Sequence, residues 1–383
     1  MRAIRLVAAV ILFTSLAGSG TAHAVGGWGT VETAGSGKDT ISLVNVGGTR
    51  YEMGFWYGKL LAGQVAGCRE KLMAAAKAAG MEFGPAVDAM WNAAYFDTKA
   101  WGEELQGVAD GCAADGHPEV TFRAMQELLM VGDISEYNCS LFAAWGKATT
   151  DGSVYQLRNL DWTMDAGIQE YPVVAVYHPK DGRVHAVVGF AAMLGAAGGG
   201  MNDRGLAVSE IMGHFGDRET LNGIPFPVLL RDVLYHEKTL DGGLARMRQA
   251  VRTNQYHFAL ADPNAAGAKG RLIFSSHLRF DVFSDVRIVG HPVETPDPFH
   301  ERLEDVVYWR KHNGSGNQVE HDALAARYGK IDAERAIEVA QACGVEGTLL
   351  SIVYHNSGKE FWVAFAEGLE PAHKQGYVHF VLK

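Results

Sequence analysis

The residue types best suited to chemistry lie in one short stretch, between Cys139 and Asp161. A cysteine becomes a strong nucleophile once it is a thiolate, and a nearby guanidinium such as that of Arg158 favours this form. Asp161 supplies a carboxylate that could orient an amine base. Asp151-Gly152 is a typical turn between two strands, so a hairpin would return Arg158 to the side of Cys139. The alternative interpretation is a buried structural cysteine with a surface Arg–Asp pair.

Other catalytic signatures are missing from the sequence. It has no G-x-S-x-G nucleophile motif, no H-E-x-x-H zinc motif and no complete phosphate-binding loop. The four cysteines fit no common zinc spacing, so we expect no metal, nucleotide or flavin cofactor. Four cysteines allow three full pairings, and a bridge between Cys68 and Cys112 is one open possibility.

The composition predicts a globular protein. The chain has 383 residues, of which 48% are apolar and 20% charged, and its formal net charge is −10. So many apolar residues exclude a disordered chain, and the acidic balance argues against a nucleic-acid-binding protein. The length allows one large domain or two, and no repeat or low-complexity linker divides it.

The first 24 residues predict a secretory signal peptide. Met1–Arg5 carries two positive charges, Leu6–Ala17 is apolar, and Ala22-His23-Ala24 resembles a cleavage site. The apolar run is shorter than the ~20 residues that a membrane span needs, and no later run is long and apolar enough. We therefore expect a secreted or periplasmic protein with no stable membrane span.

The elements around the reactive stretch change in kind at Cys139. A short strand is expected at 41–46, and residues 50–136 have mainly helical periodicity, with segments at 51–80, 83–96, 99–113 and 119–135. Beyond them the patterns predict strands at 139–147, 153–160, 172–178, 184–190, 206–212, 256–262, 270–276, 279–289, 349–354, 361–366 and 377–382. Helices are expected at 226–237, 240–252, 299–311, 320–328 and 332–342.

This order predicts an α+β fold, with two packed, mainly antiparallel sheets flanked by helices. Strands do not alternate singly with helices, which argues against a doubly wound parallel sheet. An α-rich part (25–138) and a β-rich part (139–383) would together form one fold.

The stretch C-S-L-F-A-A-W-G-K-A-T-T-D-G-S-V-Y-Q-L-R-N-L-D-W resembles the start of the catalytic chain in N-terminal-nucleophile (Ntn) hydrolases. The nearest resemblance is to the acyl-coenzyme A:6-aminopenicillanic acid acyltransferase (isopenicillin N acyltransferase) family, with the choloylglycine hydrolases as relatives. Further segments similar to this family lie at residues 48–58, 107–111, 201–208 and 351–354. The resemblance implies the αββα sandwich of Ntn hydrolases.

The resemblance also implies a mechanism. Such enzymes are inactive precursors that cut themselves before the nucleophile, here between Asn138 and Cys139, and the two chains stay associated. The freed α-amine of Cys139 would be the base for its own thiol. Arg158 would polarise the thiol and Asp161 would orient the amine. The implied substrate is a small acyl amide (a C–N bond) or thioester, attacked by Cys139 to give an acyl-enzyme.

The sequence departs from the family where oxyanion donors are expected. Thr295-Pro296-Asp297 stands in place of Thr-Asn-His, and Ser209–Met212 lacks an expected Asn. Proline offers neither a side-chain amide nor an N–H group. Asn159, Glu210 and His214 are the further candidates for substrate or oxyanion contacts, and Asn159 has a structural alternative because neighbouring strand residues face opposite ways.

Three functions therefore remain open at this point. The first is a secreted amidohydrolase or acyltransferase that uses Cys139. The second is a lipid amidase or phospholipase-B-like hydrolase, because related families share Cys-Ser at the nucleophile. The third is a non-catalytic binding protein with the Ntn fold, against which the joint presence of Cys139, Arg158 and Asp161 argues.

Overall fold

Two β-sheets form the centre of the molecule in the computed structural model. It describes residues 25–78, 80, 84–133, 138–213, 220–286, 288, 300–311 and 316–383. The expected signal peptide (1–24) lies outside these ranges.

The two sheets are built from strands that are distant in the sequence. The first has nine strands, in the spatial order β1 (Trp28–Ala34), β2 (Ile41–Gly48), β5 (Pro172–Pro179), β6 (His185–Phe190), β7 (Gly200–Asn202), β8 (Ala207–Met212), β9 (Tyr256–Ala261), β10 (Gly270–Ser275) and β11 (Phe280–Phe283). The second has six, in the order β12 (Val306–Lys311), β3 (Asn138–Gly146), β4 (Gly152–Asp161), β13 (Thr348–His355), β14 (Glu360–Phe365) and β15 (Val378–Val381). Neighbouring strands pair antiparallel except β2 with β5, which are parallel.

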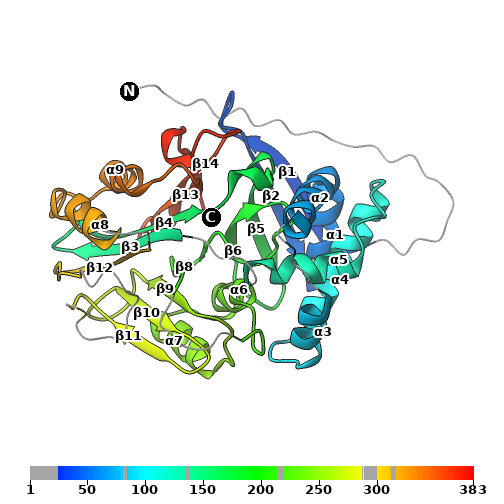
Figure 1. Cartoon of the computed structure of the whole chain (residues 1–383), viewed down its shortest axis with the longest axis horizontal. Helices are drawn as coiled ribbons and strands as arrows, with labels where there is room; N and C mark the ends of the chain where they lie inside the picture. Colours follow the sequence, from blue (N-terminus) through cyan, green and yellow to red (C-terminus); the bar gives the residue numbers. More distant parts are fainter. Residues whose placement is uncertain are drawn as a thin grey trace.

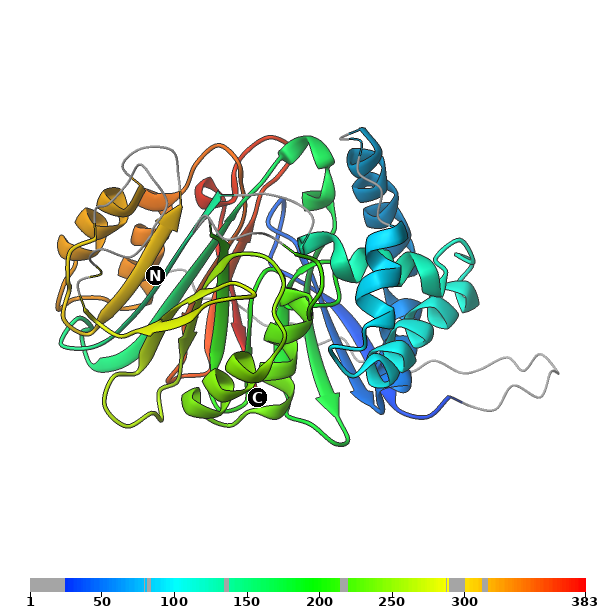
Figure 2. The ribbon, with the colours of Figure 1, turned by 60° about the horizontal axis from the view of Figure 1, so that its bottom comes forward.

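Helices cover the outer face of each sheet (Figures 1 and 2). The helices are α1 (Arg50–Leu60), α2 (Ala62–Ala78), α3 (Gly84–Asn92), α4 (Thr98–Ala114), α5 (Phe122–Met130), α6 (Phe226–His236), α7 (Leu240–Gln249), α8 (Gly316–Ala325) and α9 (Ala333–Cys343). Helices α8 and α9 pack on the six-stranded sheet, whereas α1, α6 and α7 pack on the nine-stranded sheet. Since β8 and β9 lie against β3 and β4, the order of layers is helix, sheet, sheet, helix. The expected α+β class is confirmed.

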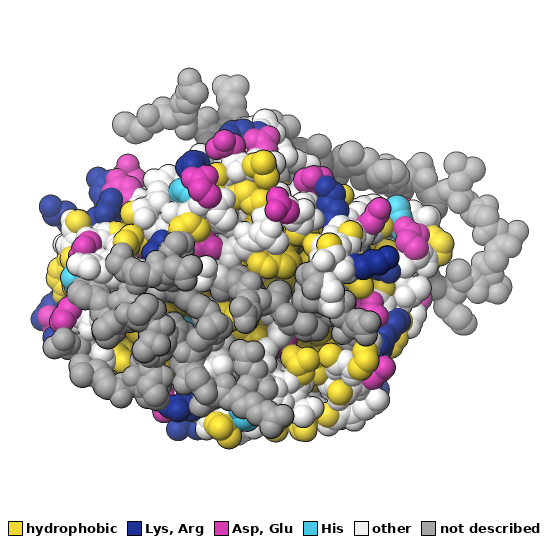
Figure 3. Space-filling model, in the orientation of Figure 1, with side chains coloured by type: hydrophobic (Ala, Val, Ile, Leu, Met, Phe, Trp, Pro, Cys, Tyr) yellow, Lys and Arg dark blue, Asp and Glu magenta, His cyan; other side chains and the backbone are white. Residues whose placement is uncertain are grey.

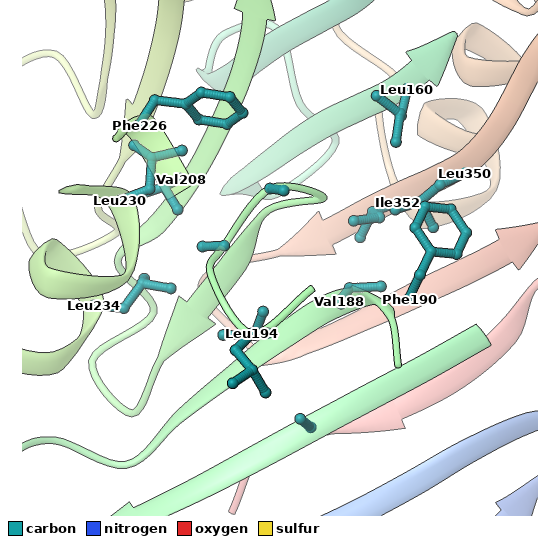
Figure 4. Close-up of a cluster of buried hydrophobic side chains, with 14 of the residues drawn as sticks. Leu160, Val188, Phe190, Leu194, Val208, Phe226, Leu230, Leu234, Leu350 and Ile352 are labelled. Atoms are coloured by element: carbon teal, nitrogen blue, oxygen red, sulfur yellow. The ribbon is translucent and has the colours of Figure 1, made fainter. Parts of the chain in front are cut away.

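An apolar core fills the space between the sheets. Figure 4 shows Leu160 of β4 and Leu350 and Ile352 of β13 close to Val188 and Phe190 of β6. All five side chains are buried. At ~25 cal/mol per Å² of apolar surface removed from water, such side chains contribute about 1.5–3 kcal/mol each, so the two sheets are held in one arrangement.

Helices α1 and α4 approach each other closely through glycines. A Cβ placed on Gly54 or Gly58 would lie 2.1 or 2.2 Å from a carbonyl oxygen of α4, and one on Gly107 or Gly111 would lie 2.3 or 2.1 Å from a carbonyl oxygen of α1. Any side chain there would push the helices apart. The small residues in segments 48–58 and 107–111 therefore have a packing role.

The start of α1 also explains part of segment 48–58. The Thr49 hydroxyl accepts a hydrogen bond from the Glu52 N–H (3.3 Å), and the Glu52 carboxylate accepts one from the Thr49 N–H (2.8 Å). This capping box satisfies two backbone donors at the helix start and determines where α1 begins.

The structure corrects the helix expected at 299–311. Residues 306–311 instead form β12, which pairs antiparallel with β3 and places Lys311 opposite Cys139. Val306-Val307-Tyr308-Trp309 is a β-branched and aromatic run, which favours a strand. Strands β1 and β7 are additional to the expected elements, and the expected helix 51–80 is divided into α1 and α2 at Leu61.

All four cysteines are buried free thiols, so Cys68 and Cys112 do not form a bridge in the structure. No helix among the described residues is long and apolar enough to cross a membrane. Figure 3 shows acidic and basic side chains interspersed around one face, with apolar side chains between them.

Candidate active site

The hairpin of β3 and β4 brings Cys139 and Arg158 to one face of the six-stranded sheet. Cys139 pairs with Leu160, and Leu141 pairs with Arg158. Directly paired residues share a face, and so do residues two apart along one strand. Cys139 and Arg158 therefore lie diagonally on the face toward the other sheet, and not directly opposite each other.

The thiol of Cys139 is fully buried in the uncut chain. Burial raises the pKa of this thiol to about 12, because a buried thiolate loses its hydration. The positive charge of Arg158 is the main effect that lowers this pKa, and a hydrogen bond from the Asp161 backbone lowers it slightly. The negative charges of Glu210 and Asp161 raise it further. The thiol is therefore protonated and inaccessible in this state.

Arg158 connects the two sheets. Its guanidinium lies 3.2 Å from the carboxylate of Glu210 on β8, and both side chains are fully buried. The same guanidinium donates to the backbone carbonyl of Asn159 (2.5 Å). A buried ion pair of this kind holds the guanidinium in one orientation, so Glu210 fixes Arg158 on the face of the sheet that carries the Cys139 side chain.

Asp161 lies at the end of β4, directly across from Asn138. One oxygen of its carboxylate accepts a hydrogen bond from the Thr348 hydroxyl (2.7 Å), while Oδ2 is buried with no partner among the described residues. Burial raises the pKa of this carboxyl to about 7, against the opposing effects of Thr348 and of Arg310 and Arg158. Asp161 is thus next to the bond that would be cut.

Further charged groups gather on the outer face of the same sheet. Arg310 of β12 lies opposite Ser140, and its guanidinium donates to the carbonyl of Cys343 at 3.2 Å. Glu320 of α8 is fully buried. Arg310 was not predicted because a helix is expected at 299–311; the aromatic and β-branched run at 306–309 is the signal that would place it on a strand. Glu320 lies in the expected helix 320–328, and its place beside the sheet depends on the packing of α8 on β12.

Asn159 has structural partners. Its side chain donates to the carbonyl of Ala340 on α9 (2.9 Å) and accepts from the hydroxyl of Ser351 (2.6 Å). It lies on the face opposite to Arg158, so its side chain attaches α9 to the sheet. His214 and Thr295-Pro296-Asp297 lie outside the described residues.

A cavity of about 820 Å³ lies elsewhere, among α4, α6 and α7, and includes Arg50, Tyr235 and Arg246 in its lining. None of Cys139, Arg158 and Asp161 lines it. No group of three or more metal-ligating side chains is found among the residues that the structure describes.

The arrangement brings together a thiol, a guanidinium that favours its thiolate, and a carboxyl beside the preceding peptide bond. A thiolate can attack an acyl carbon, and a fixed cation can stabilise the charge that moves during the attack. The groups are thus suited to acyl transfer through cysteine.

No family model matches the chain. Protein dcd1B of Dictyostelium discoideum is 25% identical to it over 92% of this chain and 76% of that protein. Protein dcd1A of the same organism is 28% identical over 64% of this chain and 56% of its own length.

Three solved structures are similar to parts of the chain. An N-acylethanolamine-hydrolyzing acid amidase ortholog from Caenorhabditis elegans overlaps 64% of this chain and 100% of its own, with 12% identity and a TM-score of 0.42. Penicillin V acylase from Agrobacterium tumefaciens overlaps 60% and 83%, with 12% identity and a TM-score of 0.42. A mutant conjugated bile acid hydrolase from Clostridium perfringens overlaps 59% and 89%, with 13% identity and a TM-score of 0.39.

Proposed function

We propose that this protein is the precursor of a cysteine Ntn amidohydrolase or acyltransferase that cuts itself between Asn138 and Cys139. The observation that carries the proposal is the convergence of three groups at the start of β3. Arg158 acts on the Cys139 thiol from the same face, and Asp161 lies across from Asn138.

Self-cleavage begins with attack of the Cys139 sulfur on the carbonyl carbon of Asn138. The C–N bond breaks, the nitrogen takes a proton and becomes the α-amine of Cys139, and a thioester joins the two parts. Water then hydrolyses the thioester, which leaves a carboxylate on Asn138 and a free thiol on Cys139.

The same thiol then acts on substrate. The α-amine takes the thiol proton, and the thiolate attacks the acyl carbon of an amide or thioester. The departing amine or thiol takes the proton back, and an acyl-enzyme remains on Cys139. Water or a second amine releases the acyl group. Arg158 stabilises the thiolate, and Asp161 Oδ2 accepts a hydrogen bond from the α-amine.

The state of Cys139 in the uncut chain supports an inactive precursor. Its thiol has no access to solvent and a pKa of about 12. A thiol in this state reacts slowly with any substrate. The proposal therefore predicts that activity follows cleavage and does not precede it.

Intact-mass measurement of the purified protein tests the proposal. We expect two fragments that meet at the Asn138–Cys139 bond, and a single uncut chain for Cys139→Ala. Cys68→Ala is the matched control because Cys68 is also a buried free thiol, on α2, and it should be cut normally.

Incubation of the cleaved protein with acyl amides, including fatty acyl amides, should add the acyl mass to the fragment that begins with Cys139. An uncut wild-type chain that turns over amides would contradict self-processing. Cleaved protein that never acquires an acyl group would instead favour the non-catalytic binding protein.

We also propose that the chain is exported and loses residues 1–24, on the basis of the charged and apolar pattern of this segment. Amino-terminal sequencing of the protein from its native host should begin at Val25. Protein that retains Met1–Ala24 and stays in the cytoplasm would overturn this part.

A further inference from the structure

We infer that Glu320, Arg310 and Asp161 form a buried charge cluster which receives the α-amine of Cys139 after cleavage, and that Glu320 is a positioning residue that sets the protonation of this amine. The inference rests on the proposed function, because the amine exists only in the cut protein. It adds two groups, from α8 and β12, to those already assigned.

The cluster contains buried acceptor atoms that lack donors among the described residues. Both carboxyl oxygens of Glu320 and Oδ2 of Asp161 are buried and have no hydrogen-bond partner among the described residues. Buried carboxyl oxygens almost always have donors, because a buried acceptor without a donor loses its hydration and gains no bond in exchange. Three such atoms in one cluster indicate a site prepared for donors that the described part of the uncut chain does not supply.

The charges in the cluster are unequal, because two carboxyls lie near one guanidinium. Burial raises the pKa of Glu320 well above its ordinary value, Arg310 opposes this rise, and Asp161 adds to it. Arg310 likewise lowers the pKa of Asp161. Two carboxyls thus share one guanidinium, and a buried pair with one cation retains a proton. The other titratable groups near the cluster are Tyr308, Cys343, Cys139 and Arg158.

Cleavage supplies both the donors for these acceptor atoms and a second cation for the two carboxyls. The Cys139 nitrogen carries one N–H in the peptide bond, but as an α-amine it has up to three donors and titrates near ~8. It follows Asn138, which pairs directly with Asp161. The new ammonium is a second cation for the two carboxyls of the cluster. The negative charge of Glu320 therefore stabilises the protonated amine electrostatically, without direct contact.

Glu320→Gln removes one negative charge at nearly constant shape. Because the protonated amine loses a favourable charge, its pKa should fall, and the neutral amine should be available to the thiol at lower pH. Arg310→Gln removes a positive charge and should have the opposite effect. At an effective dielectric constant of about 20, a charge roughly 12 Å away moves a titration by about one pH unit.

The probe is iodoacetamide, which needs no knowledge of the substrate. The cleaved protein is alkylated across pH 5–10, and labelling of Cys139 is followed by peptide mass mapping. We expect the midpoint of Cys139 labelling to move down by about one pH unit in Glu320→Gln and up in Arg310→Gln. Glu320→Asp keeps the charge and should restore the wild-type midpoint.

Asp322→Asn is the matched control, because Asp322 lies on the same helix with an exposed side chain. Equal midpoints in wild type and Glu320→Gln, or shifts of the same sign in Glu320→Gln and Arg310→Gln, would overturn the inference. If one variant fails to fold, the sign of the shift in the other still decides it. A wild-type chain that is never cut refutes the proposed function instead, so the two failures are distinguishable.

Discussion

Arg158 has two partners with different requirements. The Cys139 thiol needs a cation nearby to become a thiolate, and Glu210 needs one because its carboxylate is fully buried. One guanidinium compensates the Glu210 carboxylate and favours the Cys139 thiolate. The ion pair therefore affects both the stability of the fold and the reactivity of the thiol. Glu210 was expected from sequence only as a candidate for substrate contact, and the structure gives it this positioning contact.

At the scale of residues we predict an unequal cost for breaking this ion pair. Arg158→Met removes the guanidinium that pairs with the buried Glu210 carboxylate, which should destabilise the fold by about 3–5 kcal/mol. The double variant Arg158→Met/Glu210→Gln removes both charges and should recover part of the loss. Urea unfolding in the uncut Cys139→Ala background measures both values, and equal losses in the single and double variants would contradict the prediction.

At the scale of elements, the link between α5 and α6 depends on one buried carboxylate. Asp133, at the end of the 3₁₀ turn Val131–Asp133, accepts hydrogen bonds from the Phe226 N–H and from the hydroxyls of Thr253 and Tyr256. These bonds attach the segment before the proposed cleavage site to α6 and to the start of β9.

We predict a pH dependence of stability from Asp133. Burial raises the pKa of its carboxyl to about 6, from an ordinary value near ~4, although its three hydrogen bonds oppose the rise. The folded chain therefore binds a proton more tightly than the unfolded chain, and the contribution of Asp133 to stability falls as pH rises from about 4 to 6.

Asp133→Asn should remove this dependence. Between pH 4.5 and 7, the wild type should lose about 2 kcal/mol of unfolding free energy relative to the variant. Urea unfolding at both values measures the difference, with the exposed Asp115→Asn as control. A difference that grows in favour of the wild type as pH rises would refute the assignment.

The β3–β4 hairpin and strand β12 show which elements local sequence patterns can predict. The β3–β4 hairpin was predicted because its strands and turn are adjacent in sequence. Strand β12 was missed because segment 299–311 also has helical periodicity, and its pairing with β3 involves residues far apart in the chain.

At the scale of the molecule, a buried ion network joins the parts before and after the proposed cleavage site. Glu104 of α4 contacts Arg50 of α1 at 3.0 Å and Arg231 of α6 at 2.6 Å. Each guanidinium also lies 3.8 Å from an aromatic ring centroid, Arg50 over Tyr235 and Arg231 over Tyr177. Together with the parallel pairing of β2 and β5, these contacts would hold the two chains together after the proposed cleavage.

We predict that Glu104→Gln weakens this association. It leaves two buried guanidinium groups with reduced compensation and should cost about 3–5 kcal/mol. Glu103→Gln is the matched control, since Glu103 is the adjacent residue and is partly exposed on the surface. Gel filtration of the cleaved proteins in moderate urea should separate the two chains of Glu104→Gln, whereas the two chains of Glu103→Gln should still elute together. If the two chains elute together in both variants at every urea concentration, the network does not have this role.

The sequence by itself determined the features that depend on near neighbours or on composition. These are the α+β class, most strands and helices, and the hairpin that places Arg158 near Cys139. The glycine segments 48–58 and 107–111 were recognised by resemblance, but their role in packing α1 on α4 needed coordinates.

Only the tertiary structure decided which distant groups surround the hairpin. Glu210, Arg310 and Glu320 come from β8, β12 and α8, and their distance to Cys139 depends on how sheets and helices pack. Local pattern predicts which face of an element is buried, but it carries no information on which distant charge lies opposite. The charge environment of the thiol and of the neighbouring carboxyl therefore follows from packing, because electrostatic effects depend on distances in space and on burial.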